Sequence, residues 1–232
     1  MMSPLILLPG KMCDFRLYGP QIEALSGQYS LKLIPITNHS SIQQLAANVI
    51  ARAPDRFGIA GLSMGGIVAM EVFAQAPERV ERIALLDTNP KADLEAAKNT
   101  RIPQIEKVLR GELESLMREV IIPSYSVAGP QREDILNLCL NMALDLGKTV
   151  FKRQSHALQT RPDQCRNLSQ IKVPTLILCG AEDQLCPVSQ HQMMHELIKN
   201  SRFEIIQGAG HLPTLEQPEK TTEALLRWLK DS

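Results

Sequence analysis

Ser63 carries the strongest signal for covalent chemistry in this sequence. It is the central residue of 61–65, Gly-Leu-Ser-Met-Gly, which follows the apolar run 57–62 and opens a helical pattern. A serine in such a G-x-S-x-G segment lies on a sharp strand-to-helix turn that exposes its hydroxyl, and the glycines avoid collisions with the neighbouring strand and helix. The helix N-terminus adds partial positive charge for a developing oxyanion. Ser63 is therefore predicted to be a nucleophile. A phosphate-binding P-loop is excluded, because no Gly-Lys-Ser/Thr follows.

A serine hydroxyl needs a neighbouring base to take its proton, and His211 is the best candidate. Of the five histidines, it is the one on a loop between a predicted strand and a closing helix, in Gly-Ala-Gly-His at 208–211. The glycines let the backbone place the imidazole at the carboxyl edge of a sheet. Surface or packing roles are expected for the other four, which are His39, His156, His191 and His195. Of these, His156 could also face a pocket.

The base in turn needs an acceptor that fixes its tautomer and orientation. Asp183 lies just past the predicted strand 175–179, at the same edge of the sheet as Ser63. Asp87, at the end of the preceding strand, is the competing candidate. The chain order Ser63, Asp183, His211 matches the Ser…Asp…His order of one known arrangement, which favours Asp183. Its neighbour Glu182 is expected to be solvated.

Two backbone amides are expected to bind the oxyanion that forms when a serine attacks a carbonyl. The amide of Met64, directly after the nucleophile, is the first. The second should come from the loop after the first strand, where Pro-Gly-Lys-Met occupies 9–12. The N–H of Lys11 is the candidate there, with Met12 second.

Short apolar runs alternate with segments of helical periodicity along the chain. The runs are rich in Ile, Leu and Val and nearly continuous, as in strands buried on both faces; they cover 4–8, 31–36, 57–62, 82–87, 175–179 and 202–206. Helical patterns cover 42–53, 65–75, 190–198 and 215–229. This alternation predicts an α/β fold with a parallel sheet and helices on both faces.

The segment from about 90 to 167 breaks that alternation. It has no convincing strand, and apolar residues recur at spacings of three and four in 102–120 and 135–146, with a third helical stretch at about 148–160. Several helices inserted between two strands of a parallel sheet predict a lid over its carboxyl edge, with ordinary packing helices as the alternative.

The composition excludes several classes of function. Lys and Arg number 25 and Asp and Glu number 25, so the basic excess of a nucleic-acid-binding protein is missing. The five cysteines form no C-x-x-C pair, which argues against a zinc site or a disulfide framework. The apolar run near the start, 4–8, lacks a basic flank and is too short for a signal peptide or a membrane span. A cytoplasmic protein without metal is expected.

Together, these residues resemble the α/β-hydrolase superfamily over nearly the whole chain. The matching elements are Pro9-Gly10, the run 61–66, Val173-Pro174-Thr175 before 180–183 and Pro187, and Gly210-His211 before 216–219. The chain looks most like small capped members, which include carboxylesterases, enol-lactonases, carbon–carbon bond hydrolases and cofactor-free perhydrolases. The resemblance implies one domain over residues 1–232, with the lid inserted at about 90–167.

Three features distinguish the chain within that superfamily. Many members carry His-Gly at the oxyanion loop, where this chain has Pro9-Gly10. The first two of the usual eight strands have no counterpart, so a six-stranded, all-parallel sheet is expected. Members with an aspartate nucleophile are disfavoured, because Ser63 occupies that position.

The predicted activity is hydrolysis of an ester through an acyl-enzyme, without metal or organic cofactor. The same residues could serve an enol-lactonase, a carbon–carbon bond hydrolase, a perhydrolase or an acyltransferase. A receptor-like protein that binds a ligand with little turnover is the alternative of another class, and a purely structural domain is a third. The apolar side chains of 90–167 predict a mainly apolar pocket for an acyl or cyclic group. Arg153 and Arg161 could anchor a carboxylate, although surface positions are expected for both. The sequence carries no signal of oligomeric state.

Overall fold

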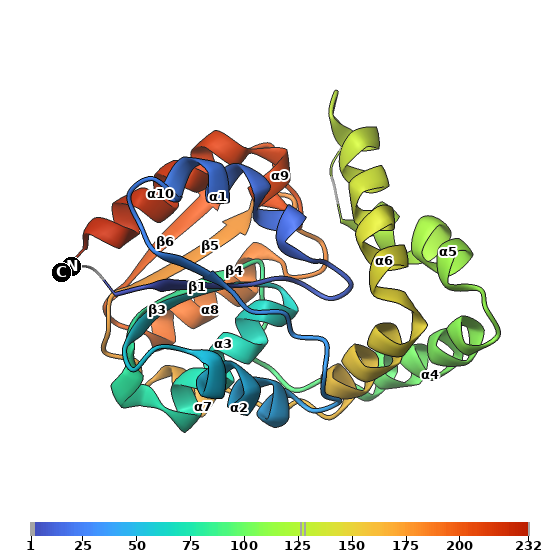
Figure 1. Ribbon diagram of the computed structural model, residues 1–232, viewed down its shortest axis with the longest axis horizontal. Coiled ribbons are helices and arrows are strands. Elements are labelled where there is room, and N and C mark those ends of the chain that lie inside the picture. Colours follow the sequence, from blue (N-terminus) through green and yellow to red (C-terminus); the bar gives the residue numbers. More distant parts are fainter. Residues whose placement is uncertain (1–2, 126, 128, 232) are drawn as a thin grey trace.

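Six parallel strands form the central sheet of the protein, in the order β2-β1-β3-β4-β5-β6 (Figure 1). The computed structural model describes residues 3–125, 127 and 129–231. The strands are β1 (Leu5–Leu8), β2 (Leu31–Leu33), β3 (Phe57–Leu62), β4 (Val80–Leu86), β5 (Thr175–Gly180) and β6 (Ser201–Ile206). The predicted α/β fold with a six-stranded parallel sheet is thus confirmed. β1, β3 and β5 are buried along their whole length, which explains why their sequences do not alternate between apolar and polar residues.

β2 is shorter than the predicted strand 31–36. It is an edge strand that pairs only with β1, in a register from Leu5–Leu31 to Leu7–Leu33. β1 ends at Leu8, and the next residue, Pro9, has no N–H to continue the ladder. The apolar side chains that follow β2 are nevertheless buried, which is why the apolar run continues past the end of the strand.

Helices cover both faces of the sheet and enclose two separate apolar cores. Alternate side chains of each strand enter different cores: Leu5 and Leu7 of β1 face one, Ile6 and Leu8 the other. The first core lies under α1 (Gly19–Leu25) and α10 (Pro218–Lys230). The second lies under α2 (Ile42–Arg52), α3 (Met64–Gln75), α7 (Cys165–Leu168) and α8 (Val188–Leu197). Parallel strands are thereby shielded on both sides, as the sequence predicted.

The predicted helix 215–229 is divided in two. The short α9 (Pro213–Glu216) ends at Gln217, whose backbone is not helical (φ −138°, ψ 63°), and α10 then begins at Pro218. Proline disfavours the α conformation in the residue before it, and it fits the first turn of a new helix.

Between β4 and β5 the described residues form helices and turns and no strand. The main elements are α4 (Glu95–Leu109), α5 (Leu113–Leu116) and α6 (Arg132–Gln159). Figure 1 shows them on the side of the sheet toward which the strands point. The two helices predicted at 135–146 and 148–160 join in α6, broken only at Gly147 (φ 76°, ψ 178°). A glycine takes this conformation without the penalty that a Cβ would impose. No helix in the described part of the chain is long and apolar enough to cross a membrane.

Gly180, the last residue of β5, allows the chain around His211 to approach the sheet. A Cβ at this position would lie 2.0 Å from the carbonyl oxygen of Gly210 and 2.4 Å from that of Ala209. Both obstacles are backbone atoms, so they can move only with the loop itself.

Gly180→Ala is therefore expected to lower the free energy of unfolding by about 3 kcal/mol or more, the upper range for overpacking. Gly19→Ala is the matched control: nothing lies within 4 Å of its Cβ position and its backbone is α-helical, so a change within about 1 kcal/mol is expected. Urea denaturation measures both. Equal midpoints for the two variants would contradict the close approach at Gly180.

Candidate active site

Ser63 lies between β3 and α3 in a strained backbone conformation. Its φ is 54° and its ψ is −116°, outside the regions that residues with a Cβ ordinarily occupy. Its amide donates to the carbonyl of Leu86 at 2.9 Å, and its carbonyl accepts from Gly66 at 3.0 Å. These bonds hold the turn between the sheet and the first turn of α3. The strain that the G-x-S-x-G segment predicts is thus present in the backbone.

The two glycines that flank Ser63 permit close backbone contacts. A Cβ at Gly61 would lie 2.2 Å from the carbonyl oxygen of Gly65. A Cβ at Gly65 would lie 2.2 Å from the carbonyl oxygen of Leu8, at the end of β1. The start of α3 therefore packs directly against β1 and the loop that follows it, which carries Lys11.

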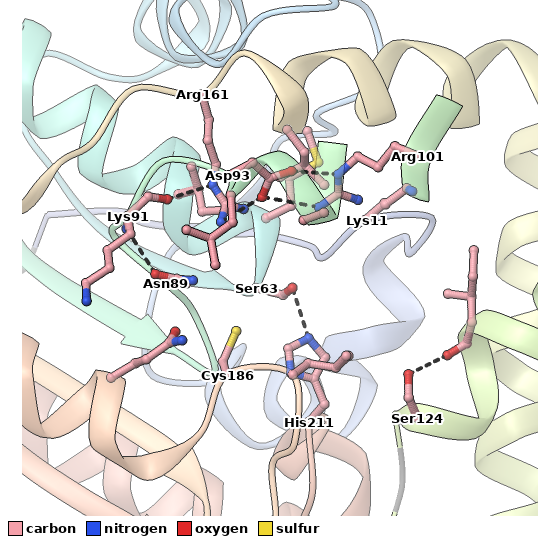
Figure 2. Close-up of a pocket in the computed structure, with 18 of the residues that line it drawn as sticks. Lys11, Ser63, Asn89, Lys91, Asp93, Arg101, Ser124, Arg161, Cys186 and His211 are labelled. Carbon is pink, nitrogen blue, oxygen red and sulfur yellow. Dashed lines mark hydrogen bonds and ion pairs between the residues drawn. The ribbon is translucent and has the colours of Figure 1, made fainter. Parts of the chain in front are cut away.

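His211 contacts both of its predicted partners. Its Nε2 is 2.9 Å from Oγ of Ser63, and its Nδ1 is 2.8 Å from Oδ2 of Asp183 (Figure 2 shows the first contact). In the tautomer whose Nδ1–H donates to Asp183, Nε2 is an acceptor for the Ser63 hydroxyl proton. The side chain of His211 is only 5% exposed, and that of Asp183 is fully enclosed. The structure therefore brings the predicted nucleophile, base and acid into one hydrogen-bonded chain.

Asp183 is held as a carboxylate. Its Oδ1 accepts from the amides of Leu185 at 2.8 Å and Cys186 at 3.0 Å. Burial acts to raise the pKa of Asp183, but its hydrogen bond to His211 and these amide donors outweigh burial and lower that pKa. An ionised acid next to Nδ1 suits the stabilisation of a charged imidazole.

Asp87, the competing acid, has a different environment. It is fully buried, and its Oδ1 accepts from the amide of Gly180 at 2.9 Å. Burial, and then the charge of Asp183, raise the pKa of Asp87 well above its ordinary value, so this carboxyl keeps its proton to a higher pH than an exposed aspartate does. The structure brings Asp183, and not Asp87, to the ring of His211.

Glu216 of α9 fixes the position of the loop that carries His211. The sequence showed this residue only as part of the matching run 216–219 and indicated no role for it. Oε2 of Glu216 accepts from the amides of Gly210 at 2.9 Å and Leu212 at 3.0 Å, on either side of His211. The amide of His211 donates to the carbonyl of Tyr125 at 2.9 Å, and the two rings are 5.8 Å apart. Glu216 was visible in the sequence as an acidic residue shortly after His211, but its partners are backbone amides, which no side-chain pattern reveals.

The structure distinguishes between the two oxyanion candidates of the β1 loop. The amide of Met12 donates to Oε1 of Gln154 at 2.8 Å, so it is already occupied. Gln154 is fully buried in α6, and its amide group donates to the carbonyl of Ile36 at 3.0 Å. The amides of Lys11 and Met64 have no hydrogen-bond partner within the described part of the chain, and both residues line the cavity at Ser63.

The remaining histidines take the positions expected of them. His191 is fully buried in α8, its Nε2 accepts from the amide of Thr88 at 3.0 Å, and burial lowers its pKa to about 4, so it is neutral. His39, His156 and His195 are partly exposed and are not among the described residues that line the cavity at Ser63.

A cavity of about 610 Å³ opens at Ser63 and His211. Much of its lining is apolar, which agrees with the predicted pocket for an acyl group; these residues include Ile67, Leu94, Val120, Ile121, Leu158 and Leu185. Leu94, Val120 and Leu185 are also substantially exposed, so they form an apolar rim. A cavity of this size is typical of a small-molecule site.

Charged side chains also line this cavity, and here the sequence-based expectation was wrong. Arg161 was expected at the surface, but its side chain is only 9% exposed and pairs with Asp93. The side chains of Arg101 and Lys11 line the same cavity. Nothing in the sequence indicated that either side chain would lie in a pocket. Arg153 is exposed as expected. Figure 2 shows Asp93 between the two arginines.

One group of described residues has the geometry of a possible metal site, and it overlaps the hydrogen-bonded chain. Asp183, Cys186 and His211 each place one ligand atom within 4.8 Å of the others. A thiol binds metal as the thiolate, and burial raises the pKa of Cys186 well above its ordinary value. Nδ1 of His211 is engaged with Asp183. This donor set therefore suits proton transfer better than metal binding.

Comparisons with known proteins give the same picture of the fold. Residues 53–218 match the family model described as alpha/beta hydrolase fold. Pimeloyl-[acyl-carrier protein] methyl ester esterase of Nitrosomonas europaea is 25% identical over 234 residues, which cover 93% of this chain and 91% of that protein. 3-Oxoadipate enol-lactonase 1 of Acinetobacter baylyi is 25% identical over 231 residues, which cover 94% and 85%.

Solved structures agree. A thermophilic esterase from Thermogutta terrifontis superposes with a TM-score of 0.89 at 26% identity, covering 98% of this chain and 89% of that one. The enol-lactonase from Burkholderia xenovorans has a TM-score of 0.89 at 20% identity, covers 100% and 92%, and shows likeness of fold alone. Because the family match spans well over half of the chain, the protein belongs to the α/β-hydrolase fold family, which confirms the resemblance that its sequence carries.

Proposed function

We propose that the protein is a serine hydrolase that cleaves an ester by transferring its acyl group first to Ser63 and then to water. The observation that carries this proposal is the hydrogen-bonded chain from Ser63 through His211 to Asp183 at the wall of a 610 Å³ cavity. Relatives named as an esterase and an enol-lactonase, each matched over most of its length, support hydrolysis of ester bonds as the coarse activity.

In the first half of the reaction, Nε2 of His211 takes the proton of the Ser63 hydroxyl while Oγ attacks the ester carbonyl carbon. The carbonyl oxygen becomes an oxyanion, to which the amides of Lys11 and Met64 donate. Nε2–H then donates its proton to the leaving alkoxide oxygen. The carbon–oxygen bond of the ester breaks, the alcohol departs, and the acyl group remains on Oγ.

In the second half, water replaces the alcohol. His211 takes a proton from the water, whose oxygen attacks the acyl carbon, and then returns that proton to Oγ as the acid leaves. The carboxylate of Asp183 stabilises the imidazolium in both halves. Its lowered pKa supports this role, because the acid must stay ionised while the histidine carries charge.

The loop after β1 supports the proposed oxyanion site. Gln154 of α6 fixes the neighbouring Met12 amide, and Gly65 allows α3 to approach the same loop closely. These contacts hold the amides of Lys11 and Met64 before substrate arrives, which is the condition for strong oxyanion stabilisation.

We also propose that the helices between β4 and β5 act as a lid, inserted at about 90–167 in a single domain that spans 1–232. Val120, Ile121, Tyr125 and Leu158 from this segment line the same cavity as Ser63. Their apolar side chains would surround the acyl or cyclic part of a small-molecule ester and exclude water from the acyl-enzyme.

A lactone is the second candidate substrate, since it is a cyclic ester open to the same attack. The relative named 3-oxoadipate enol-lactonase 1 favours it over other chemistries of the family. In a lactone the alcohol stays attached to the acyl group, so the same two steps yield a single hydroxy acid.

Labelling by a fluorophosphonate and turnover of p-nitrophenyl esters, from acetyl to octanoyl, test the proposal. Wild type is expected to hydrolyse the esters and to take up one equivalent of probe, with the mass shift on the peptide that contains Ser63. Ser124→Ala is the matched control, because Ser124 lines the same cavity while its hydroxyl donates to the carbonyl of Ile121 at 2.7 Å. This variant should still be labelled. Absence of both labelling and turnover would contradict the proposal and leave ligand binding as the leading function.

A further inference from the structure

Two arginines share a single carboxylate in the wall of the cavity. Nε of Arg101 lies 2.7 Å from Oδ2 of Asp93, and Nη2 of Arg161 lies 3.0 Å from its Oδ1. Nε of Arg161 also donates to the carbonyl of Lys91 at 2.8 Å. The exposed fractions of the side chains are 3% for Asp93, 9% for Arg161 and 19% for Arg101. This is a buried charged cluster built from residues at the start of the helical segment and from Arg161, which lies just after α6.

The positive charges of this cluster exceed the negative ones. Asp93 neutralises one of the two guanidinium groups, and each guanidinium offers five N–H donors in a planar fork. Burial lowers the pKa of Arg161, Asp93 opposes this effect, and the charge of Arg101 adds to it. An arginine stays protonated in proteins, so the surplus charge remains at an energetic cost.

Lys11 places a third basic side chain on the same cavity wall. Its Nζ lies 4.1 Å from the centre of the Phe151 ring, over the face of the aromatic system. Burial lowers the pKa of Lys11 to about 7, and the positive charge of Arg101 contributes to that lowering. Lys91 lines the cavity as well but is exposed at its rim.

A structural role for these residues accounts for only part of the arrangement. A single arginine would neutralise the carboxylate of Asp93. That one ion pair would also connect the helical segment to the loop after β4 without leaving a net positive charge. A second buried guanidinium carries a desolvation penalty that Asp93 alone does not offset, and so does the side chain of Lys11 whenever it is protonated. A negatively charged group bound within the cavity would offset this desolvation penalty.

We propose that Arg101 and Arg161, organised by Asp93, form a subsite for an anionic group of the substrate, a carboxylate or a phosphate, at the end remote from the ester bond. The proposal rests on the proposed function and narrows its substrate class. Arginine presents parallel donors that match either anion. In the view of Figure 2 the cluster lies on the opposite side of Ser63 from His211. The substrate would then place its ester at Ser63 and its anion against the guanidinium groups, with apolar atoms between them.

Three p-nitrophenyl esters of one chain length test the subsite in the wild-type protein. The first is the mono ester of suberic acid, with a free carboxylate at its far end; the second is its neutral methyl ester; the third carries a phosphonate in place of the carboxylate. We expect kcat/KM to be about 10- to 100-fold higher for an anionic ester than for the neutral one, the range of a charge-assisted hydrogen bond. The carboxylate and phosphonate esters distinguish the two kinds of anion.

Charge-removing variants locate the effect. Arg161→Gln and Arg101→Gln are each expected to lower kcat/KM for the preferred anionic ester by about 10- to 100-fold. The rate with the neutral methyl ester should change little. Arg153→Gln is the matched control, because Arg153 belongs to the same helical segment but is exposed. It removes the same charge outside the cavity and should leave the ratio of the two substrates unchanged. Equal losses for both esters in the Arg161 and Arg101 variants would indicate a purely structural role and overturn the proposal.

Binding without chemistry separates the two proposals. Calorimetric titration of the wild-type protein with suberate and with inorganic phosphate measures occupancy of the subsite directly. Binding of an anion with no ester turnover would support the subsite and contradict the hydrolase. Turnover with no preference for charge, and no binding of either anion, would support the hydrolase and overturn the subsite. Because both measurements use wild type, they decide the question even if an arginine variant fails to fold.

Discussion

Ser63→Ala is expected to lower kcat for p-nitrophenyl esters by on the order of a million-fold, the cost of losing the nucleophile from a working triad. Without Oγ no acyl-enzyme forms, and His211 is left without the hydroxyl it would activate. The amides of Lys11 and Met64 remain, so a residual rate of about 10³- to 10⁴-fold over the reaction in water is expected.

Steady-state kinetics with purified variants measures this loss, provided that contamination by wild type is held below the expected residual rate. Ser124→Ala controls for any change in the shape of the cavity, and it should retain wild-type turnover within a small factor. Melting temperatures establish that each variant is folded. A Ser63→Ala protein that turns over esters at a rate close to wild type would mean that the chemistry resides elsewhere.

Asp183→Asn is expected to reduce kcat by on the order of 10⁴-fold, the effect of replacing the acid of such a triad by an amide. The asparagine amide group cannot accept the Nδ1–H bond in the same way, so it favours the tautomer in which Nε2 carries the proton. That tautomer cannot take the proton of Ser63. Loss of the negative charge also removes the stabilisation of the imidazolium.

Asp87→Asn is the matched control for Asp183→Asn. Both acids are buried, but the pKa of Asp87 is raised, and its Oδ1 accepts from the amide of Gly180, which an asparagine oxygen can also do. A change in kcat smaller than about tenfold is expected, since both hydrogen-bond partners of His211, Ser63 and Asp183, are retained. The reverse result, with the large loss in Asp87→Asn, would reassign the acid of the triad.

Asp87→Asn is also expected to change how the free energy of unfolding depends on pH. In the folded protein the pKa of Asp87 is raised, whereas in the unfolded chain it is ordinary, about 3.9. Above that pH the unfolded chain gains by ionising and the folded protein does not, so this group destabilises the fold increasingly as pH rises toward its folded pKa. Asp87→Asn removes the effect. The stability of the variant relative to wild type should therefore increase from pH 4 to pH 7, and a constant difference would contradict a raised pKa of Asp87.

The roles of Gln154 and Glu216, which fix the loops around the site, could not have been predicted from the sequence. Gln154 and Glu216 act through backbone amides at Met12, Gly210 and Leu212, and amides carry no residue-specific signal. Met12 and Gln154 are also 142 positions apart in the chain. The preference for the amide of Lys11 over that of Met12 as the proposed oxyanion donor therefore depended on the packing of α6 against the β1 loop.

The sequence by itself determined the parallel sheet and the serine at the strand-to-helix turn. The apolar composition of runs such as 57–62 indicates strands that are buried on both faces. The glycines at 61 and 65 indicate a tight turn, because the backbone segments pack so closely there that a Cβ would collide with them. Those signals lie within a few residues of each other. The length of β2 could not be predicted from such local signals, because it depends on where the partner strand β1 ends.

Only the tertiary structure decided which charged residues belong to the site. By pattern, Arg161 and Arg153 are equivalent basic residues near the end of the helical segment, yet one is buried against Asp93 and the other is exposed. The difference arises because the chain turns after α6 and brings Arg161 back toward the loop that follows β4. Local periodicity describes which face of an element is apolar, whereas the sharing of one carboxylate by two distant arginines is a property of how the elements pack.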